Sequence, residues 1–327
     1  MTETLRAWWL LSRPKLAPFV MLLPFLGWAY AHWDRALPTQ HPGAFLAVAS
    51  AWWWLHAGTL WLNAAVDRDE GEVLMGEAVP PPPFTAALGY AGLATSVAIA
   101  AFANPISGLA AALCAVLAVL YSHPATLWKA HPIGGPFVNW FGYGILSPLA
   151  GWAVADVALN PRTVVLWALG SFGVLGAYFA AQAFQGEEDR ARGYRTLVVT
   201  HGPRTTLLAA RACLAIGFVG GVALAAIGWI PRICLLAVGG WVLADRFFQQ
   251  WLAQPDGGDE SWARGFANRL LLALVLGVTL AFGQYVVDSL AGRPVAGLGT
   301  AGGHPPDRPR LPPAQMRFWD QARAHPR

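Results

Sequence analysis

Charged residues are scarce in this sequence. Of its 327 residues only 12% are Asp, Glu, Lys or Arg, whereas 56% are hydrophobic. A soluble domain usually carries about 25% charged residues, so the composition argues against a soluble globular protein. It also argues against disorder for most of the chain, because apolar stretches of roughly 20 residues recur and each can cross a bilayer as a helix.

Cysteine is rare as well. Cys114, Cys213 and Cys234 lie inside apolar stretches and have no paired spacing. This pattern indicates neither a disulfide framework nor a thiolate metal site, and we interpret the three as small core residues. The first apolar stretch lacks the small-residue cleavage pattern of a signal peptide, so we expect it to remain as a membrane helix.

The apolar windows predict an all-α polytopic membrane protein with about nine transmembrane helices. The windows are residues 7–32, 43–66, 84–103, 106–122, 134–155, 163–184, 205–229, 232–252 and 266–288. We therefore predict one transmembrane domain over residues 1–288. Residues 289–327 are rich in Gly, Pro and Arg, and we expect them to form a disordered tail.

Positive charge is distributed unevenly between the connecting segments. If the N-terminus is cytoplasmic, the inner segments hold most of the Arg and Lys residues, whereas the outer loops hold Arg35, Arg162 and Arg232. This positive-inside pattern predicts a cytoplasmic N-terminus. The sequence also has 20 Arg and 2 Lys, which indicates GC-rich DNA. We expect a multi-pass protein of a bacterial inner membrane.

Acidic residues form two clusters on the predicted cytoplasmic side. In the first, Asn63, Asp67 and Glu70 are spaced i, i+4, i+7. They share one helix face if the second helix continues past the membrane. Mg²⁺ binds through one or two carboxylates while keeping water and phosphate oxygens, so oxygen donors at the mouth of a helix bundle predict a magnesium site.

The second cluster repeats this spacing. Tyr178, Gln182, Gln185 and Asp189 follow i, i+4, i+7, i+11, which places them on one stripe leading out of the sixth window. Two polar stripes at the same membrane surface can converge on one site.

Four short motifs occur in order along residues 5 to 290. They are Arg13-Pro14, the segment from Asn63 to Asp67, Tyr121-Ser122-His123-Pro124 with Lys129, and Asp189-Arg190 followed by Gly193, Thr196 and Leu197. Together they resemble the UbiA superfamily of intramembrane prenyltransferases. The resemblance implies a helical bundle around a central cavity open to lipid, in which two Asp-rich motifs bind an isoprenyl diphosphate through Mg²⁺.

The sequence differs from the family pattern in both motifs. The first family motif reads Asn-Asp-x-x-Asp-x-x-x-Asp, and here Ala64 and Gly71 occupy two of the Asp positions. In the second motif Gln182 and Gln185 stand where the family has Asp, while Asp189 remains. Gln keeps an acceptor oxygen but carries no charge, so these changes weaken a second metal site.

The resemblance implies a role for each site residue. The implied metal ligands are Asn63, Asp67, Glu70 and Asp189, of which the three carboxylates are also the implied catalytic groups. The residues implied in substrate binding are Arg13, Asn63, Lys129, Gln182, Gln185, Arg190 and Arg195. Tyr121 and Tyr178 lie on or beside the motifs, and we expect their rings to stabilise an allylic cation.

We therefore predict Mg²⁺-dependent transfer of a prenyl group from an isoprenyl diphosphate to a lipophilic acceptor. We expect the protein to contact membrane lipids and to bind no nucleic acid. Two alternatives stay open. A terpene cyclase of the same superfamily would release a hydrocarbon without an acceptor, and a non-catalytic lipid-binding or transport protein would release no pyrophosphate. The sequence leaves the acceptor and the prenyl chain length open.

Overall fold

The protein is a bundle of helices joined mainly by short turns. The computed structural model describes residues 2–31, 42–67, 74, 76, 78–159 and 161–290, and these residues contain no β-strand. The α-helices are α1 (Glu3–Leu11), α2 (Ala17–Ala31), α3 (Pro42–Asp67), α4 (Thr85–Ala103), α5 (Pro105–Ser122), α6 (Gly134–Phe141), α7 (Ser147–Ala153), α8 (Pro161–Gln182), α9 (Gly186–Ala191), α10 (Leu197–Ala226), α11 (Ala237–Trp251) and α12 (Glu260–Leu290). Short 3-10 segments are η1 (Pro14–Leu16), η2 (Trp128–Ala130), η4 (Arg232–Leu236) and η5 (Pro255–Gly257), and η3 (Gly142–Leu146) is a π-helical turn between α6 and α7. The predicted all-α class is confirmed.

Among the described residues, six helical stretches are both long enough and apolar enough to cross a membrane. They are Glu3–Ala31, Thr85–Ala103, Pro105–Ser122, Pro161–Gln182, Leu197–Ala226 and Glu260–Asp288. The other three windows coincide with α3, with α6 to α7, and with η4 to α11. The number of nine crossings therefore stays a prediction. Residues 291–327, most of the predicted tail, lie outside the described part of the chain.

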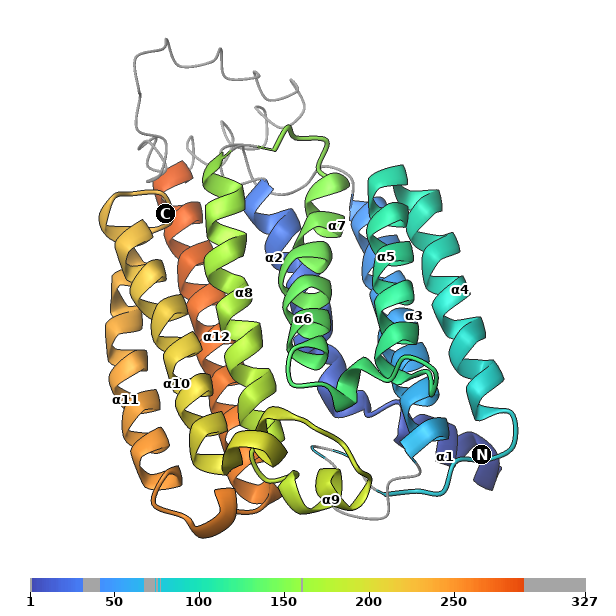
Figure 1. Cartoon of the computed structure of the whole chain (residues 1–327). Coiled ribbons are helices and arrows are strands. Elements are labelled where there is room, and N and C mark those ends of the chain that lie inside the picture. Colours follow the sequence, from blue (N-terminus) through green and yellow to red (C-terminus); the bar gives the residue numbers. More distant parts are fainter. Residues whose placement is uncertain are drawn as a thin grey trace. The chain divides into compact units, whose positions relative to one another are not determined.

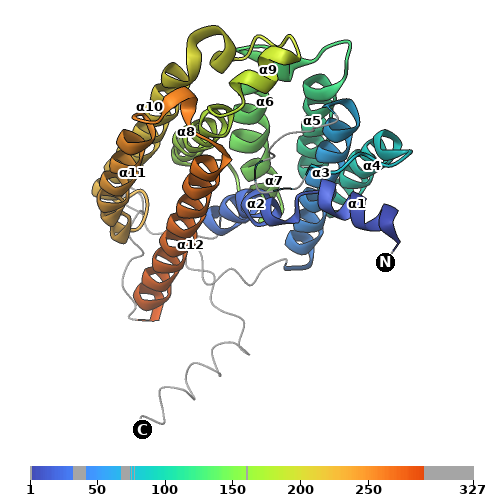
Figure 2. The ribbon, with the colours of Figure 1, turned by 90° about the horizontal axis from the view of Figure 1, so that it is seen from below.

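The first apolar window is not one continuous helix. It breaks at Arg13, whose φ of 45° lies in the left-handed region, directly before Pro14. The residue before a proline is disfavoured in the right-handed helical region, which explains the break at this pair. As a result α1 leaves α2 at an angle (Figure 2) and packs on α3, where the Trp61 indole donates to the Trp8 carbonyl at 2.7 Å.

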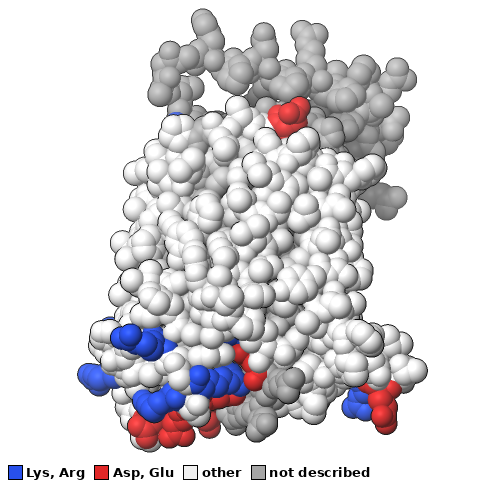
Figure 3. Space-filling view, turned by 45° about the vertical axis from the view of Figure 1, so that its right-hand side comes forward, with Lys and Arg blue, Asp and Glu red and all other residues white. Residues whose placement is uncertain are grey.

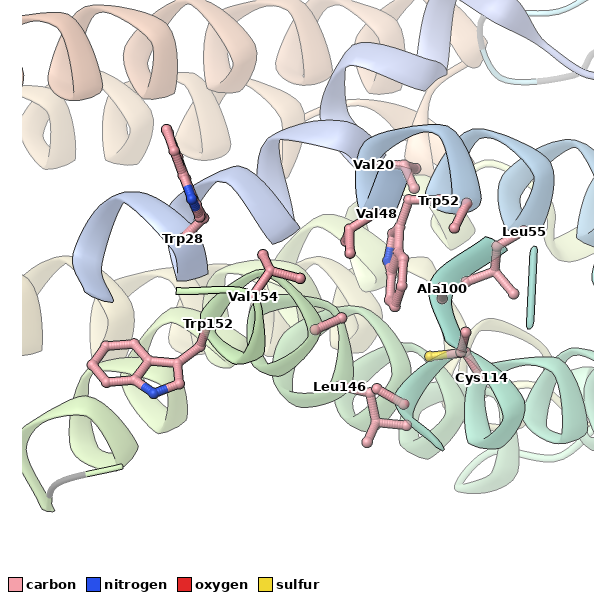
Figure 4. Close-up of a cluster of buried hydrophobic side chains, with 14 of the residues drawn as sticks. Val20, Trp28, Val48, Trp52, Leu55, Ala100, Cys114, Leu146, Trp152 and Val154 are labelled. Atoms are coloured by element: carbon pink, nitrogen blue, oxygen red, sulfur yellow. The ribbon is translucent and has the colours of Figure 1, made fainter. Parts of the chain in front are cut away.

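The helices follow one another around the bundle (Figures 1 and 2). Helix α3 packs on α4 and α5, α6 on α8, α8 on α10, and α10 on α11, while α2 packs on α7. One buried cluster surrounds Trp52 and joins α2, α3, α5 and α7 (Figure 4). A second surrounds Phe248 and Trp251 and joins α8, α10, α11 and α12. The elements that carry the predicted site thus rest on two separate cores.

An ion pair lies between two of the apolar windows, as expected for charged residues at such positions. Arg211 of α10 donates to the Asp245 carboxylate of α11 at 2.6 Å, and Gln249 donates to the same carboxylate at 2.8 Å. The pair joins α10 to α11 on the partly exposed side of both helices.

Glycines allow two pairs of helices to approach closely. A Cβ atom added to Gly151 of α7 would lie 1.8 Å from the Pro24 carbonyl oxygen of α2, and one added to Gly27 would lie 1.9 Å from the Pro148 oxygen. Helices α3 and α4 meet in the same way, because a Cβ on Gly58 would lie 2.9 Å from the Gly89 oxygen. Backbone packs on backbone at both crossings.

We expect Gly151→Ala to destabilise the protein, because the new methyl group would overlap backbone atoms of α2 that cannot rotate away. Overpacking of this kind costs about 1–3 kcal/mol, so the melting temperature in detergent should fall by about 5 °C. Gly170→Ala in α8 is the matched control, since nothing lies within 4 Å of its Cβ position. Equal melting temperatures for the two variants would contradict the close α2–α7 contact.

Candidate active site

Charged side chains gather at one end of the bundle (Figure 3). At this end α3 finishes, and α9 lies beyond the ends of α8 and α10 (Figure 1). Three chain segments supply its polar contacts: residues 63–67 of α3, residues 122–130, which begin at the last residue of α5, and residues 189–196, which run from α9 to the start of α10. The structure thus brings together segments that lie far apart in the sequence.

Asp67, the last residue of α3, pairs with Lys129. The two side chains are each 6% exposed and form an ion pair through the Lys129 ammonium and Asp67 Oδ1. The ammonium also donates to Asn63 Oδ1 at 2.9 Å, and the Ser122 hydroxyl donates to the same oxygen at 3.2 Å. Buried charges need such partners. The cation therefore lies among oxygens from two motifs that the sequence singled out.

A tight turn after α5 brings Lys129 to the end of α3, where it contacts Asn63 and Asp67. The Thr126 hydroxyl donates to the Leu120 carbonyl at 2.9 Å, and Leu127 adopts a left-handed φ of 44° before η2 begins. The carbonyl of Ala130 then accepts a hydrogen bond from the Arg195 backbone N–H at 2.8 Å. This bond joins the Lys129 turn to the segment that follows α9.

Asp189 is buried in α9 and held by a hydroxyl. Thr196 is the N-cap residue of α10, yet its side chain does not cap the helix and donates to Asp189 Oδ2 at 2.7 Å instead. Burial raises the pKa of the Asp189 carboxyl, and the hydrogen bond from Thr196 opposes that rise. The negative charge of Asp67 adds to it. The two carboxylates are therefore close enough to interact electrostatically.

Tyr194 connects the two carboxylate segments. Its hydroxyl donates to Asp67 Oδ1 at 2.9 Å, while its backbone N–H donates to the Asp189 carbonyl at 2.9 Å. Gly193, with φ of 74°, provides the turn that directs Tyr194 back toward α3. Burial and the neighbouring charge of Asp67 raise the pKa of the Tyr194 phenol, so it keeps its proton and remains a donor.

Neutral polar side chains continue from this end into the bundle. Gln182 donates to the Tyr178 hydroxyl at 3.2 Å, and Tyr178 and Asn139 both interact with Tyr121. The hydroxyl of Tyr178 also lies against Gly135, where an added Cβ would be 2.2 Å away. Within the described part of the chain, Gln182 Oε1 is buried and accepts no hydrogen bond.

The second polar stripe is not on one helix, so that prediction is wrong. Helix α8 ends at Gln182, a turn follows, and Gln185 is the N-cap of α9. The interruption rotates Asp189 out of the periodicity that a continuous helix would impose. On the first stripe Asn63 and Asp67 lie on α3, whereas Glu70 falls outside the described residues.

The predicted arginines differ in their surroundings. Arg13 is half-buried, and its Cγ and Cδ atoms lie 3.3 and 3.4 Å from a Cβ position built on Gly76. Arg190 and Arg195 are exposed at the same end. Arg192, which the sequence motifs did not single out, pairs with Glu188 at 2.6 Å.

Two roles were missed from the sequence. Tyr194 bridges the two carboxylate segments, and the Thr196 hydroxyl donates a hydrogen bond to Asp189. Thr196 belongs to the motif that begins at Asp189, and Tyr194 lies within it, so their position in the chain was a usable signal. The sequence carries no signal for the partner of Tyr194, because Asp67 lies more than 100 residues away from it. Only the fold reveals that contact.

The oxygen donors at this end suit a single Mg²⁺ ion. The described residues contain no group of three or more His, Cys, Asp or Glu side chains that could bind a metal on their own. They do place two buried or nearly buried carboxylates, Asp67 and Asp189, at one end, with the unpartnered oxygen of Gln182 nearby in the chain. Mg²⁺ needs one or two carboxylates and completes its shell with water and phosphate oxygens.

Proteins of known activity and structure are similar to this chain. It is 26% identical over 265 residues to the protoheme IX farnesyltransferase of Paracoccus denitrificans (strain Pd 1222). The aligned region covers 76% of this chain and 83% of that protein. A UbiA homolog from Archaeoglobus fulgidus, bound to GPP and Mg²⁺, has a TM-score of 0.64 at 17% identity and covers 84% of this chain and 99% of its own. The apo UbiA homolog of Aeropyrum pernix K1 has a TM-score of 0.57 at 16% identity, with 86% and 100% covered.

At these identities the solved structures show a shared fold. Residues 21–272, more than half of the chain, match the UbiA prenyltransferase family. The helical bundle and the ordered motifs agree with that match, and the chain belongs to the UbiA prenyltransferase family.

Proposed function

We propose that this protein transfers a prenyl group from an isoprenyl diphosphate to a lipophilic acceptor within the membrane. The observation that carries the proposal is the pair of carboxylates, Asp67 and Asp189, joined through Tyr194 beside the buried ammonium of Lys129. Oxygen donors and a cation at one end of an apolar bundle suit a ligand with an anionic head and a hydrocarbon tail.

The residues that would hold Mg²⁺ are Asp67 and Asp189, with Glu70 as a further ligand. When bound, the ion supplies Lewis-acid stabilisation of the negative charge that develops on the leaving diphosphate. Asn63 already accepts hydrogen bonds from Lys129 and Ser122, which fixes the orientation of its amide beside Asp67.

Cationic side chains would bind the diphosphate itself. Lys129 supplies a point charge at the base of the site, and Arg13 supplies a guanidinium from the break between α1 and α2. The exposed Arg190 and Arg195 lie at the rim, where they would meet the diphosphate first. Gln182 and Gln185 add neutral hydrogen-bonding groups.

Tyr121 and Tyr178 would line the path of the prenyl chain. Their rings lie on α5 and α8, and their hydroxyls are occupied by Asn139, Gln182 or each other. Aromatic faces stabilise a cation without reacting with it. Both side chains are partly buried, and exclusion of water around them would protect an allylic cation from hydrolysis.

The acceptor to test first is a tetrapyrrole, because the similar curated proteins are protoheme IX farnesyltransferases. We further propose that the protein lies in a bacterial inner membrane with this site facing the cytoplasm. The gathering of charged side chains at the α9 end (Figure 3) supports that orientation through the positive-inside rule.

The test uses the purified full chain in lipid vesicles with farnesyl diphosphate, Mg²⁺ and protoheme IX. We expect pyrophosphate release that requires both Mg²⁺ and an acceptor, together with a prenylated acceptor detected by mass spectrometry. If protoheme IX is inert, quinone precursors, chlorins and carotenoids are supplied in turn. Release of hydrocarbon without any acceptor would indicate a cyclase, and activity that persists in EDTA would contradict the metal-dependent mechanism.

A further inference from the structure

The segment after α9 contacts both carboxylates at once. Within residues 189–196, the Thr196 hydroxyl donates to Asp189 at 2.7 Å and the Tyr194 hydroxyl donates to Asp67 at 2.9 Å. The two donors are two residues apart in the chain. One short stretch of chain therefore bonds to an oxygen atom of each acid.

Backbone hydrogen bonds hold this stretch in place. The Tyr194 N–H donates to the Asp189 carbonyl at 2.9 Å and the Gly193 N–H to the Arg190 carbonyl at 3.0 Å, which closes the end of α9. The Arg195 N–H donates to the Ala130 carbonyl at 2.8 Å, which joins the stretch to the turn that carries Lys129. The backbone is thus held by hydrogen bonds both at Tyr194 and at the next residue, Arg195.

Asp67 is the last described residue of α3, and its side chain is 6% exposed. Its Oδ1 oxygen receives both the Lys129 ammonium and the Tyr194 hydroxyl. Two donors on one oxygen fix the rotation of the carboxylate and direct the second oxygen elsewhere. Removing the phenol hydroxyl would leave the ammonium as the remaining donor of this pair.

We propose that Tyr194 is a positioning residue that holds the Asp67 carboxylate in register with Asp189, so that both acids can bind one divalent cation. This inference rests on the proposed function, because it assigns Tyr194 to the same ion site. Tyr194 touches neither the prenyl chain nor the acceptor in this role. It acts through Asp67, and an Asp67 carboxylate that is free to turn would bind the ion less tightly.

The test is Tyr194→Phe, which removes the hydroxyl and keeps the ring. Binding of Mn²⁺, a paramagnetic substitute for Mg²⁺, is measured by electron paramagnetic resonance on the purified full chain with inorganic pyrophosphate. We expect the dissociation constant of Mn²⁺ to rise about tenfold, since a hydrogen bond to a charged group is lost. At saturating ion, kcat should change by no more than about twofold.

Tyr30→Phe is the matched control, because its hydroxyl donates to the Trp229 carbonyl at 3.4 Å and both residues lie outside the three segments of the site. It should bind Mn²⁺ as the unmodified protein does. Unchanged Mn²⁺ binding by Tyr194→Phe would overturn the inference. So would a lower ion-free melting temperature with kcat reduced equally at every ion concentration, which indicates a structural role. If the unmodified chain itself binds no Mn²⁺, the metal-dependent function fails as well.

Discussion

Replacing Asp67 with Asn should lower kcat/KM for the isoprenyl diphosphate by about a thousandfold. Asn has the same shape but no charge, so Lys129 loses its counter-ion and the divalent cation loses a carboxylate. Coulomb attraction at ~4 Å is worth about 4 kcal/mol at an effective dielectric of 20, which corresponds to about three powers of ten in rate. Pyrophosphate release at limiting substrate measures the effect.

Asp245→Asn is the control for that substitution. Asp245 also accepts from a cationic side chain, Arg211, but between α10 and α11 and outside the three segments of the site. Its kcat/KM should stay within about twofold of the unmodified protein. If Asp67→Asn retains more than a tenth of the activity, Asp67 is not a ligand of the ion that drives diphosphate departure.

Lys129→Met should reduce kcat/KM by about a hundredfold and also lower the melting temperature. The stability loss arises because Asp67 keeps its nearly buried carboxylate without the ammonium that balances it, and breaking such a pair costs about 3–5 kcal/mol. The catalytic loss arises because the diphosphate loses a point charge at the base of the site. Thermal unfolding and pyrophosphate release separate the two effects.

The other lysine of the chain provides the same chemical change elsewhere. Lys15 lies exposed in η1, so Lys15→Met should alter neither quantity. A variant at Lys129 that unfolds at a lower temperature yet keeps the original kcat/KM would show that this ammonium serves folding alone. The proposed contact with the diphosphate would then be wrong.

Apolar run length predicts the helices of this protein well, because each lipid-exposed stretch must satisfy its backbone internally. It predicts their continuity poorly. The window 7–32 breaks at Arg13-Pro14, and the window 163–184 ends in a turn just before Gln185. Both breaks depend on backbone dihedral angles, to which hydropathy is insensitive.

The candidate site, too, could be predicted from the sequence only in part. Motif order was sufficient to select Asn63, Asp67, Lys129 and Asp189, and the structure places all four at one end of the bundle, with the first three in direct contact. The bridge through Tyr194 required the fold, because hydrogen bonds between remote segments leave no periodic trace in a sequence. The role of each residue stays a prediction until the variants are measured.

The glycine crossings bear on how such a protein can diverge. A lineage can exchange residues that face the ligands, as the amides at Gln182 and Gln185 illustrate, without disturbing the contact of α7 with α2. Any side chain at Gly27 or Gly151, by contrast, would overlap backbone atoms of the neighbouring helix. The architecture therefore depends on a few backbone contacts that are separate from the side chains that set the chemistry, so one can change while the other is kept.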